Sequence, residues 1–184
     1  MTKWTRRSFI AASGATAACS GAGTSINAPR AEIDAHTDAA RAELFRTVPG
    51  AEQLAGRASG LLIIPNITEV GFMIGGSYGE GVLMIGQAKI DYFSFATASF
   101  GAQIGAQKFH HALFFMTQET LAGFRNSDGW QLGADAAFTT PDQAGVLGVS
   151  TSTINLPVHA LVFGQQGLIV GATLEGAKYS RLMR

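Results

Sequence analysis

The sequence is short of cysteine, of charged residues and of long apolar runs. Its one cysteine, Cys19, excludes an intrachain disulfide and a cysteine metal site. Charged residues make up only 14% of the 184 positions, so most of the surface must be built from Ser, Thr, Gln, Asn and Gly. The sequence has no run of about 18 apolar residues, so we expect no helix that spans a membrane.

Glycine and phenylalanine are abundant instead. The 23 glycines and 12 phenylalanines favour a β-rich fold with many turns. A chain of 184 residues is long enough for one domain with a sizeable core.

The N-terminus indicates a targeting segment. Arg6 and Arg7, followed by Ser8 and Phe9, match the pattern of twin-arginine export, and a weakly apolar run extends through residues 9–18. The alternative is a basic, frayed N-terminus, which the apolar run directly behind the arginine pair disfavours. We therefore expect export by the twin-arginine route of a bacterium.

Cys19 is a candidate for acylation. The small residues Thr16, Ala17 and Ala18 before it are similar to a bacterial lipobox, although leucine is usual where Thr16 stands. The alternative is ordinary cleavage after Ala17. Removal of the segment before Cys19 leaves 10 basic against 13 acidic residues, a net charge of −3. This charge argues against a nucleic-acid partner, and we expect a periplasmic protein or a membrane-anchored lipoprotein.

Two helices are predicted after the export signal of residues 1–19. Residues 20–29 are small and polar and indicate a flexible tether to a domain at residues 30–184. Residues 31–47 predict a helix, and residues 51–57 a shorter one. The longer helix has one stripe made of Ile33, Thr37, Ala40, Leu44 and Val48. Because its charges are mixed, packing on a sheet is favoured over a membrane-surface helix with a basic face.

The rest of the chain indicates strands. They are expected at residues 60–64, 70–77, 81–86, 96–107, 111–116, 130–138, 145–152, 158–163 and 168–174. Residues 118–124 predict a helical turn, and residues 165–167 a hairpin connection. Short connections without long helices predict an α+β fold, with an antiparallel β-sandwich or barrel-like sheet and the N-terminal helices packed on it.

Residues 96–107 alternate in polarity. Small or apolar residues occupy the even positions and mostly polar residues the odd positions. Strict alternation predicts a strand whose even-numbered face, from Ala96 to Ala106, is buried and whose odd-numbered face, from Thr97 to Gln107, is polar.

One catalytic motif is formally present. Residues 75–79 satisfy the Gly-x-Ser-x-Gly pattern with Ser77 as nucleophile, and Asp135 or Asp142 followed by His159 would complete the chain order of a hydrolase. That motif requires a strand, a sharp turn and a helix, whereas a strand-like run follows here. We therefore expect no enzyme and place Ser77 and the adjacent tyrosine at a hairpin.

The four histidines do not indicate a metal site. His110 and His111 are adjacent, so in a strand they point to opposite faces. His36 and His159 have no partner at ligand spacing. The glycines form neither a dinucleotide fingerprint nor a phosphate loop, so no cofactor is expected.

Four blocks carry a family resemblance. They are residues 58–65 (Ala-Ser-Gly-Leu-Leu-Ile-Ile-Pro), 71–83, 101–107 and 167–176. In this order the chain resembles the SYLF-domain family over roughly residues 30–182. The glycines of the second block are Gly71, Gly75, Gly76, Gly79 and Gly81. Residues 91–95 depart from the family, which usually has an aromatic-Ser-Pro-like turn there.

The resemblance implies a lipid-binding domain whose partner is a phospholipid or a membrane surface. Eukaryotic SYLF domains bind phosphoinositides and regulate actin, whereas bacterial members are mostly exported, so the actin role is not expected here. The alternatives are a structural or protein-interaction module of the envelope, and the serine hydrolase.

Two groups of residues are candidates for lipid contact. The basic residues Lys178, Arg181 and Arg184 could meet lipid phosphates or simply keep the C-terminus solvated. The aromatic candidates, which are more often core residues, are Tyr92, Phe93, Phe95 and Phe100.

Overall fold

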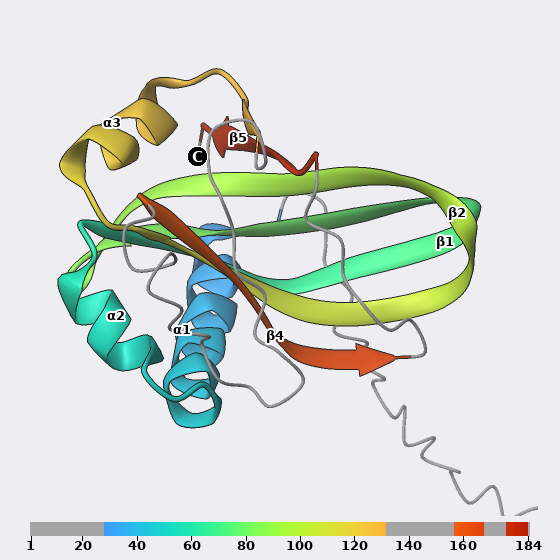
Figure 1. Ribbon diagram of the computed structural model, residues 1–184, viewed down its shortest axis with the longest axis horizontal. Helices are drawn as coiled ribbons and strands as arrows, with labels where there is room; N and C mark the ends of the chain where they lie inside the picture. Colours follow the sequence, from blue (N-terminus) through green and yellow to red (C-terminus); the bar gives the residue numbers. More distant parts are fainter. Residues whose placement is uncertain (1–27, 132–156, 168–175, 184) are drawn as a thin grey trace, which may run out of the picture.

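The computed structural model describes residues 28–131, 157–167 and 176–183 (Figure 1). Its helices are α1 (Arg30–Thr47), α2 (Ala51–Arg57) and α3 (Gln118–Asn126). Its strands are β1 (Gly60–Ile85), β2 (Ala88–Phe115), β3 (Trp130–Gln131), β4 (Val158–Gly167) and β5 (Lys178–Leu182). The predicted α+β fold is confirmed: an antiparallel, curled sheet carries the N-terminal helices on one face.

The sheet is built on one long hairpin of β1 and β2. The two strands pair antiparallel from Gly60 with Phe115 to Ile85 with Ala88, and Gly86 in the turn has a φ of 60°. The prediction of separate short strands here was wrong. Pro65 and Asn66 do not end β1, because a register shift between Ile64 and Ile67 accommodates them.

The hairpin also folds back on itself. Both strands run along the sheet, bend and return, so that the second half of β1 crosses its first half (Figure 1). At the crossing, a Cβ on Gly81 would lie 1.9 Å from the carbonyl oxygen of Ile63, and one on Gly79 would lie 2.7 Å from Cγ1 of Ile67. Only glycine permits such an approach between backbones.

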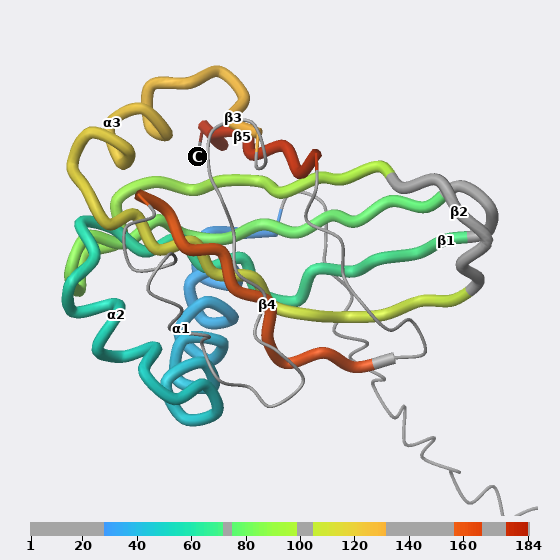
Figure 2. Tube along the Cα trace, viewed as in Figure 1, coloured from blue at the N-terminus to red at the C-terminus, as the bar shows by residue number. Residues whose placement is uncertain are grey.

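The remaining strands pair with β2 and with each other. β4 pairs with residues 107–115 of β2, and β5 pairs with residues 92–96 of β2 and with β3. Figure 2 shows β3 and β5 side by side near α3. The hairpin predicted at residues 165–167 was wrong, since β4 continues through Gly167 and Gln166 pairs with Lys108. The predicted strands at residues 145–152 and 168–174 lie outside the described residues.

Two cores cover the two faces of the sheet. On the outer face, α1 buries the stripe predicted from the sequence: Ile33, Thr37, Ala40, Leu44 and Val48. On the inner face, α3 closes over a cluster of aromatic residues: Phe93, Phe95, Phe109, Phe115, Phe124, Trp130 and Tyr179. Burying both faces explains why much of the sheet is apolar on both sides. Within the described residues, no helix has the length and apolar character needed to cross a bilayer.

The prediction that the even-numbered face of residues 96–107 is buried and the odd-numbered face exposed was wrong for the residues whose side chains are described. Ala96, Ala98 and Ala106 are exposed, whereas Gln107 is buried and donates a hydrogen bond to Glu69. Ala96, Ala98 and Ala106 continue the outer face, on which Tyr92 contacts α1. The alanines lie beyond the part of that face that α1 covers.

Candidate functional site: a basic pocket at the end of β5

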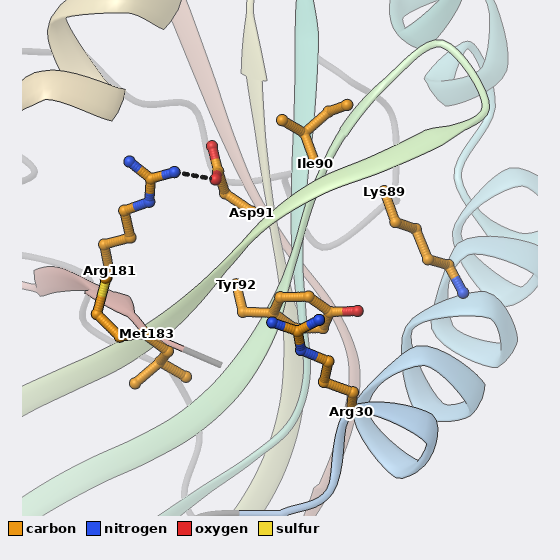
Figure 3. Close-up of a pocket in the computed structure, with 8 residues that line it drawn as sticks. Arg30, Lys89, Ile90, Asp91, Tyr92, Arg181 and Met183 are labelled. Carbon is orange, nitrogen blue, oxygen red and sulfur yellow. Dashed lines mark hydrogen bonds and ion pairs between the residues drawn. The ribbon is translucent and has the colours of Figure 1, made fainter.

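A pocket of about 440 Å³ lies where α1 begins, near the start of β2 and the end of β5 (Figure 3). Its lining combines basic, apolar and aromatic side chains: Arg30, Lys89, Ile90, Asp91, Tyr92, Arg181, Leu182 and Met183. The strand register explains its position. Tyr92 of β2 pairs with Leu182 at the end of β5. The residues of β2 that precede Tyr92 therefore have no pairing partner on β5.

A bulge in β2 arranges the side chains of the pocket. Leu83 pairs with Asp91 but Met84 pairs with Lys89, so Ile90 is an extra residue without a cross-strand partner. In a regular strand, residues 89 and 92 would point to opposite faces. Because of the bulge, both Lys89 and Tyr92 reach α1.

On the α1 side, two acidic residues hold Lys89 and Tyr92. The Lys89 Nζ lies 2.8 Å from Oδ2 of Asp38 and 3.7 Å from Oδ1 of Asp34, and the Tyr92 hydroxyl donates to Asp34 at 3.1 Å. Burial lowers the pKa of Lys89, but the hydrogen bond to Asp38 and the charges of both aspartates outweigh it and raise that pKa overall. Lys89 therefore stays positively charged.

Arg30 lies over the ring of Tyr92, with 5.3 Å between the guanidinium carbon and the ring centre (Figure 3). Stacking of this kind orients a guanidinium while its N–H groups stay available at the edge. Arg30 is exposed, and among the described residues no carboxylate forms an ion pair with it.

On the opposite side of β2, Asp91 is buried between two arginines. The Arg125 Nε donates to Oδ2 of Asp91 at 2.8 Å, and Arg181 donates to Oδ1. The Arg181 side chain keeps 46% of its surface exposed. Asp91 thus ties α3 and β5 to the bulged part of β2.

Exposed apolar side chains border the charged groups. Four large hydrophobic residues are exposed in the described part of the chain: Val70, Ile85, Ile90 and Met183. Ile90 and Met183, the latter 93% exposed, line the pocket. Ile85 pairs with Ala88, the residue that precedes the pocket-lining Lys89. Basic and apolar groups therefore share this part of the surface.

The basic residues proposed from the sequence do not form one cluster here. Arg181 lines the pocket, whereas exposed Lys178 lies at the other end of β5, next to Gly129. Arg184 lies outside the described residues, as do Arg6, Arg7 and Cys19. Sequence reasoning missed Arg30 and Lys89 as parts of a site, because they come from distant segments that share no local motif.

The aromatic candidates divide between core and pocket. Phe93 and Phe95 are buried in the inner core, whereas half-buried Tyr92 lines the pocket. The Phe100 side chain lies outside the described part of the structure. The more common role of strand aromatics, as core residues, thus holds for two of the four.

Ser77 is not at a turn, and that prediction was wrong. It pairs with Thr97 in the middle of β1 and is buried, and its Oγ accepts a hydrogen bond from the Thr97 hydroxyl at 3.0 Å. The strand continues through Tyr78 and Gly79, so the strand-turn-helix geometry of a nucleophile elbow is not formed. His159 pairs with Phe114, and Asp135 and Asp142 lie outside the described residues.

The glycine block serves the bend and the crossing of the hairpin. Gly71 pairs with Gly105, Gly75 pairs with Ser99, and a Cβ on Gly76 would lie 3.1 Å from the Thr97 carbonyl oxygen. Gly79 and Gly81 lie at the crossing itself. These contacts give the motif a structural role.

His110 and His111 point to opposite faces, as predicted. His110 approaches Glu43 on α1, and its Nδ1 accepts a hydrogen bond from the Asn66 backbone N–H at 2.9 Å. His111 lies on the inner face, bonded to Tyr179. Within the described residues, no three His, Cys, Asp or Glu side chains are grouped to hold a metal ion.

Comparison with known proteins relates part of the chain to a family. Residues 96–182 match the family described as Ysc84, Las17-binding protein actin regulator. Over these residues, which are just under half of the chain, the protein is similar to SYLF domains. The match covers most of β2 and continues to Leu182, and it confirms the resemblance seen in the sequence. Of the pocket lining it includes Arg181 and Leu182, whereas the other six residues lie outside it. No curated protein matches the chain.

The family supports a coarse function. SYLF domains form a lipid-binding, non-catalytic family, so the match supports a lipid-binding or actin-regulator-like domain. A phospholipid partner is consistent with it.

Proposed function

We propose that this SYLF-like domain binds the surface of a membrane containing anionic phospholipid, through the basic pocket and its apolar border. The observation that carries the proposal is that Arg30, Lys89 and Arg181 line one pocket beside exposed Ile90 and Met183. The domain acts by binding, without catalysis.

Two kinds of contact contribute to the affinity. A basic side chain near an anionic surface contributes about 1 kcal/mol, and this contribution is screened by salt. Full burial of the 93% exposed Met183 side chain contributes about 1.5 to 3 kcal/mol, and burial of the 39% of Ile90 that is exposed contributes less; salt does not screen either contribution. Each term alone is modest, so the proposal requires both at the same surface.

We propose further that the protein is exported and works in a bacterial envelope. The Arg6–Arg7 pair supports the twin-arginine route, and the small residues before Cys19 support acylation. A contact made by the domain would add to the membrane affinity of such an anchor.

Flotation with vesicles tests the lipid contact. The full chain carrying Cys19→Ser, which has no acylation site, should float with phosphatidylcholine vesicles that contain phosphatidylglycerol and not with phosphatidylcholine alone. Salt should weaken this binding without abolishing it. The double variant Ile90→Gln, Met183→Gln should lose the vesicle binding that remains at high salt. Val70→Gln replaces an exposed residue outside the pocket lining, so this control variant should bind as the parent does.

A folded protein that floats with none of these vesicles would contradict the proposal. That result would favour a structural or protein-interaction module of the envelope.

A further inference from the structure

We propose that the basic pocket takes a monoanionic phosphodiester headgroup and discriminates against headgroups with additional phosphate charges. This inference rests on the proposed function, since it requires the pocket to meet a membrane. The observation behind it is the balance of charges around the pocket.

The cations of the pocket are largely neutralised within the protein. Among the described residues, four cations line the pocket or pair with its lining: Arg30, Lys89, Arg125 and Arg181. Three carboxylates face them: Asp34, Asp38 and Asp91. The group therefore has one net positive charge, which matches the single negative charge of a phosphodiester.

Arg30 is the cation best placed to receive that charge. Lys89 pairs with two aspartates and Arg181 pairs with Asp91, whereas Arg30 has no carboxylate partner among the described residues. Its stacking on Tyr92 holds the guanidinium plane beside the pocket (Figure 3). A planar guanidinium can donate two parallel hydrogen bonds to the two non-bridging oxygens of a phosphodiester.

The same arrangement disfavours a polyanionic headgroup. Additional phosphates on the α1 side would lie near the carboxylates of Asp34 and Asp38, which outnumber Lys89, the one cation paired with them. The cost of bringing further negative charges to these carboxylates offsets the attraction to the cations.

Vesicle binding at matched surface charge tests the selectivity. The full chain with Cys19→Ser is compared on phosphatidylcholine vesicles containing either phosphatidylglycerol or phosphatidylinositol bisphosphate, at equal total headgroup charge. Binding to the phosphatidylglycerol vesicles should be at least as tight. Tighter binding to the bisphosphate vesicles would overturn the inference and leave the proposed function standing, whereas no binding to either would overturn both.

Two variants test the assignment of residues. Arg30→Gln should lower the affinity for phosphatidylglycerol vesicles about fivefold, while Arg46→Gln, an exposed arginine at the other end of α1, should not change it. Asp38→Asn, which removes an exposed carboxylate, should raise the affinity for the bisphosphate vesicles relative to the phosphatidylglycerol vesicles about fivefold. Equal effects of Arg30→Gln and Arg46→Gln, or no shift in preference with Asp38→Asn, would contradict the charge-matching account.

Soluble competitors separate a headgroup in a membrane from a free phosphate. Inorganic phosphate and glycerophosphoglycerol should displace the protein from vesicles no more than sodium chloride of equal ionic strength, because neither offers apolar contact to Ile90 and Met183. Displacement beyond the salt effect would assign the pocket to a free phosphate compound and overturn the lipid headgroup as its occupant.

Discussion

At the scale of single residues, His111 is a buried polar side chain with a hydrogen-bond partner at each ring nitrogen. It is fully buried on the inner face, where its Nδ1–H donates to the Leu161 carbonyl at 3.0 Å and its Nε2 accepts from the Tyr179 hydroxyl at 2.6 Å. Burial lowers the pKa of His111 to about 4, although the bond to Leu161 acts in the opposite direction. Burial also raises the pKa of Tyr179. Both side chains are therefore neutral at pH 7.

The lowered pKa of His111 predicts that acid destabilises the fold. The unfolded chain binds a proton at His111 with a pKa of 6.5, so it gains more protons than the folded chain as the pH falls. The stability due to neutral His111 is complete above pH 6.5 and is lost between pH 6.5 and about 4, a change of roughly 3 kcal/mol in the free energy of unfolding.

Urea unfolding across this pH range measures the effect. His111→Gln keeps a polar side chain that cannot titrate, so its stability should depend less on pH than that of the parent. An identical pH dependence in both proteins would assign the effect to other groups, among which His110 and His159 also have a pKa lowered by burial.

At the scale of elements, the hairpin of β1 and β2 depends on the crossing of β1 over itself. The second half of β1 lies so close to the first that the backbone of Ile63 and Ile64 occupies the place of a side chain at position 81. Strand pairing alone does not require this approach. The crossing closes the inner face of the sheet around the aromatic core.

A methyl group at position 81 should therefore be severely destabilising. Gly81→Ala places a Cβ 1.9 Å from the Ile63 carbonyl oxygen and 2.7 Å from the Ile64 Cα, both backbone atoms that cannot rotate away. We expect a loss of about 3 kcal/mol or more in the free energy of unfolding, at the upper end of the range for overpacking. Thermal and urea unfolding measure it.

Gly56→Ala is the matched control for this substitution. Gly56 lies in α2 with nothing within 4 Å of the added Cβ, so alanine should stabilise the protein by about 0.5 to 1 kcal/mol. Similar stability of Gly81→Ala and the parent would show that β1 does not cross itself at this distance.

At the scale of the whole molecule, the domain has its basic pocket at the start of α1, directly after the segment expected to be a tether. If Cys19 carries an acyl chain, about ten residues separate it from Arg30, and they reach at most about 35 Å when fully extended. The anchor would then hold the pocket near the membrane into which the acyl chain is inserted. The two proposed contacts would act on one membrane at a high effective concentration.

Fractionation of cells tests export and anchoring. Arg6→Lys with Arg7→Lys should leave the precursor in the cytoplasm, because the transporter recognises the arginine pair. Cys19→Ala should move the exported protein from the membrane fraction towards the soluble fraction, with the modest affinity of the pocket retaining only a part. An unmodified mass at Cys19 together with unchanged membrane association would contradict the lipoprotein proposal.

The sequence by itself determined the two N-terminal helices, the fold class and the family resemblance. The stripe from Ile33 to Val48 repeats at a helical period, and the bounds of both N-terminal helices follow from residues near them in the chain, such as Pro49 and Gly50. Such signals are local, so they can be read from one segment at a time.

Tertiary structure decided the continuity of the hairpin, the faces of residues 96–107 and the pocket. One extra residue, Ile90, changes which side chains of β2 point to α1, and no local pattern reveals where such a bulge falls. The extent of α1 decides which alanines of β2 are covered. Arg30, Lys89 and Arg181 line one pocket only because α1 packs on the hairpin and β5 pairs with β2, and these contacts join segments far apart in the chain.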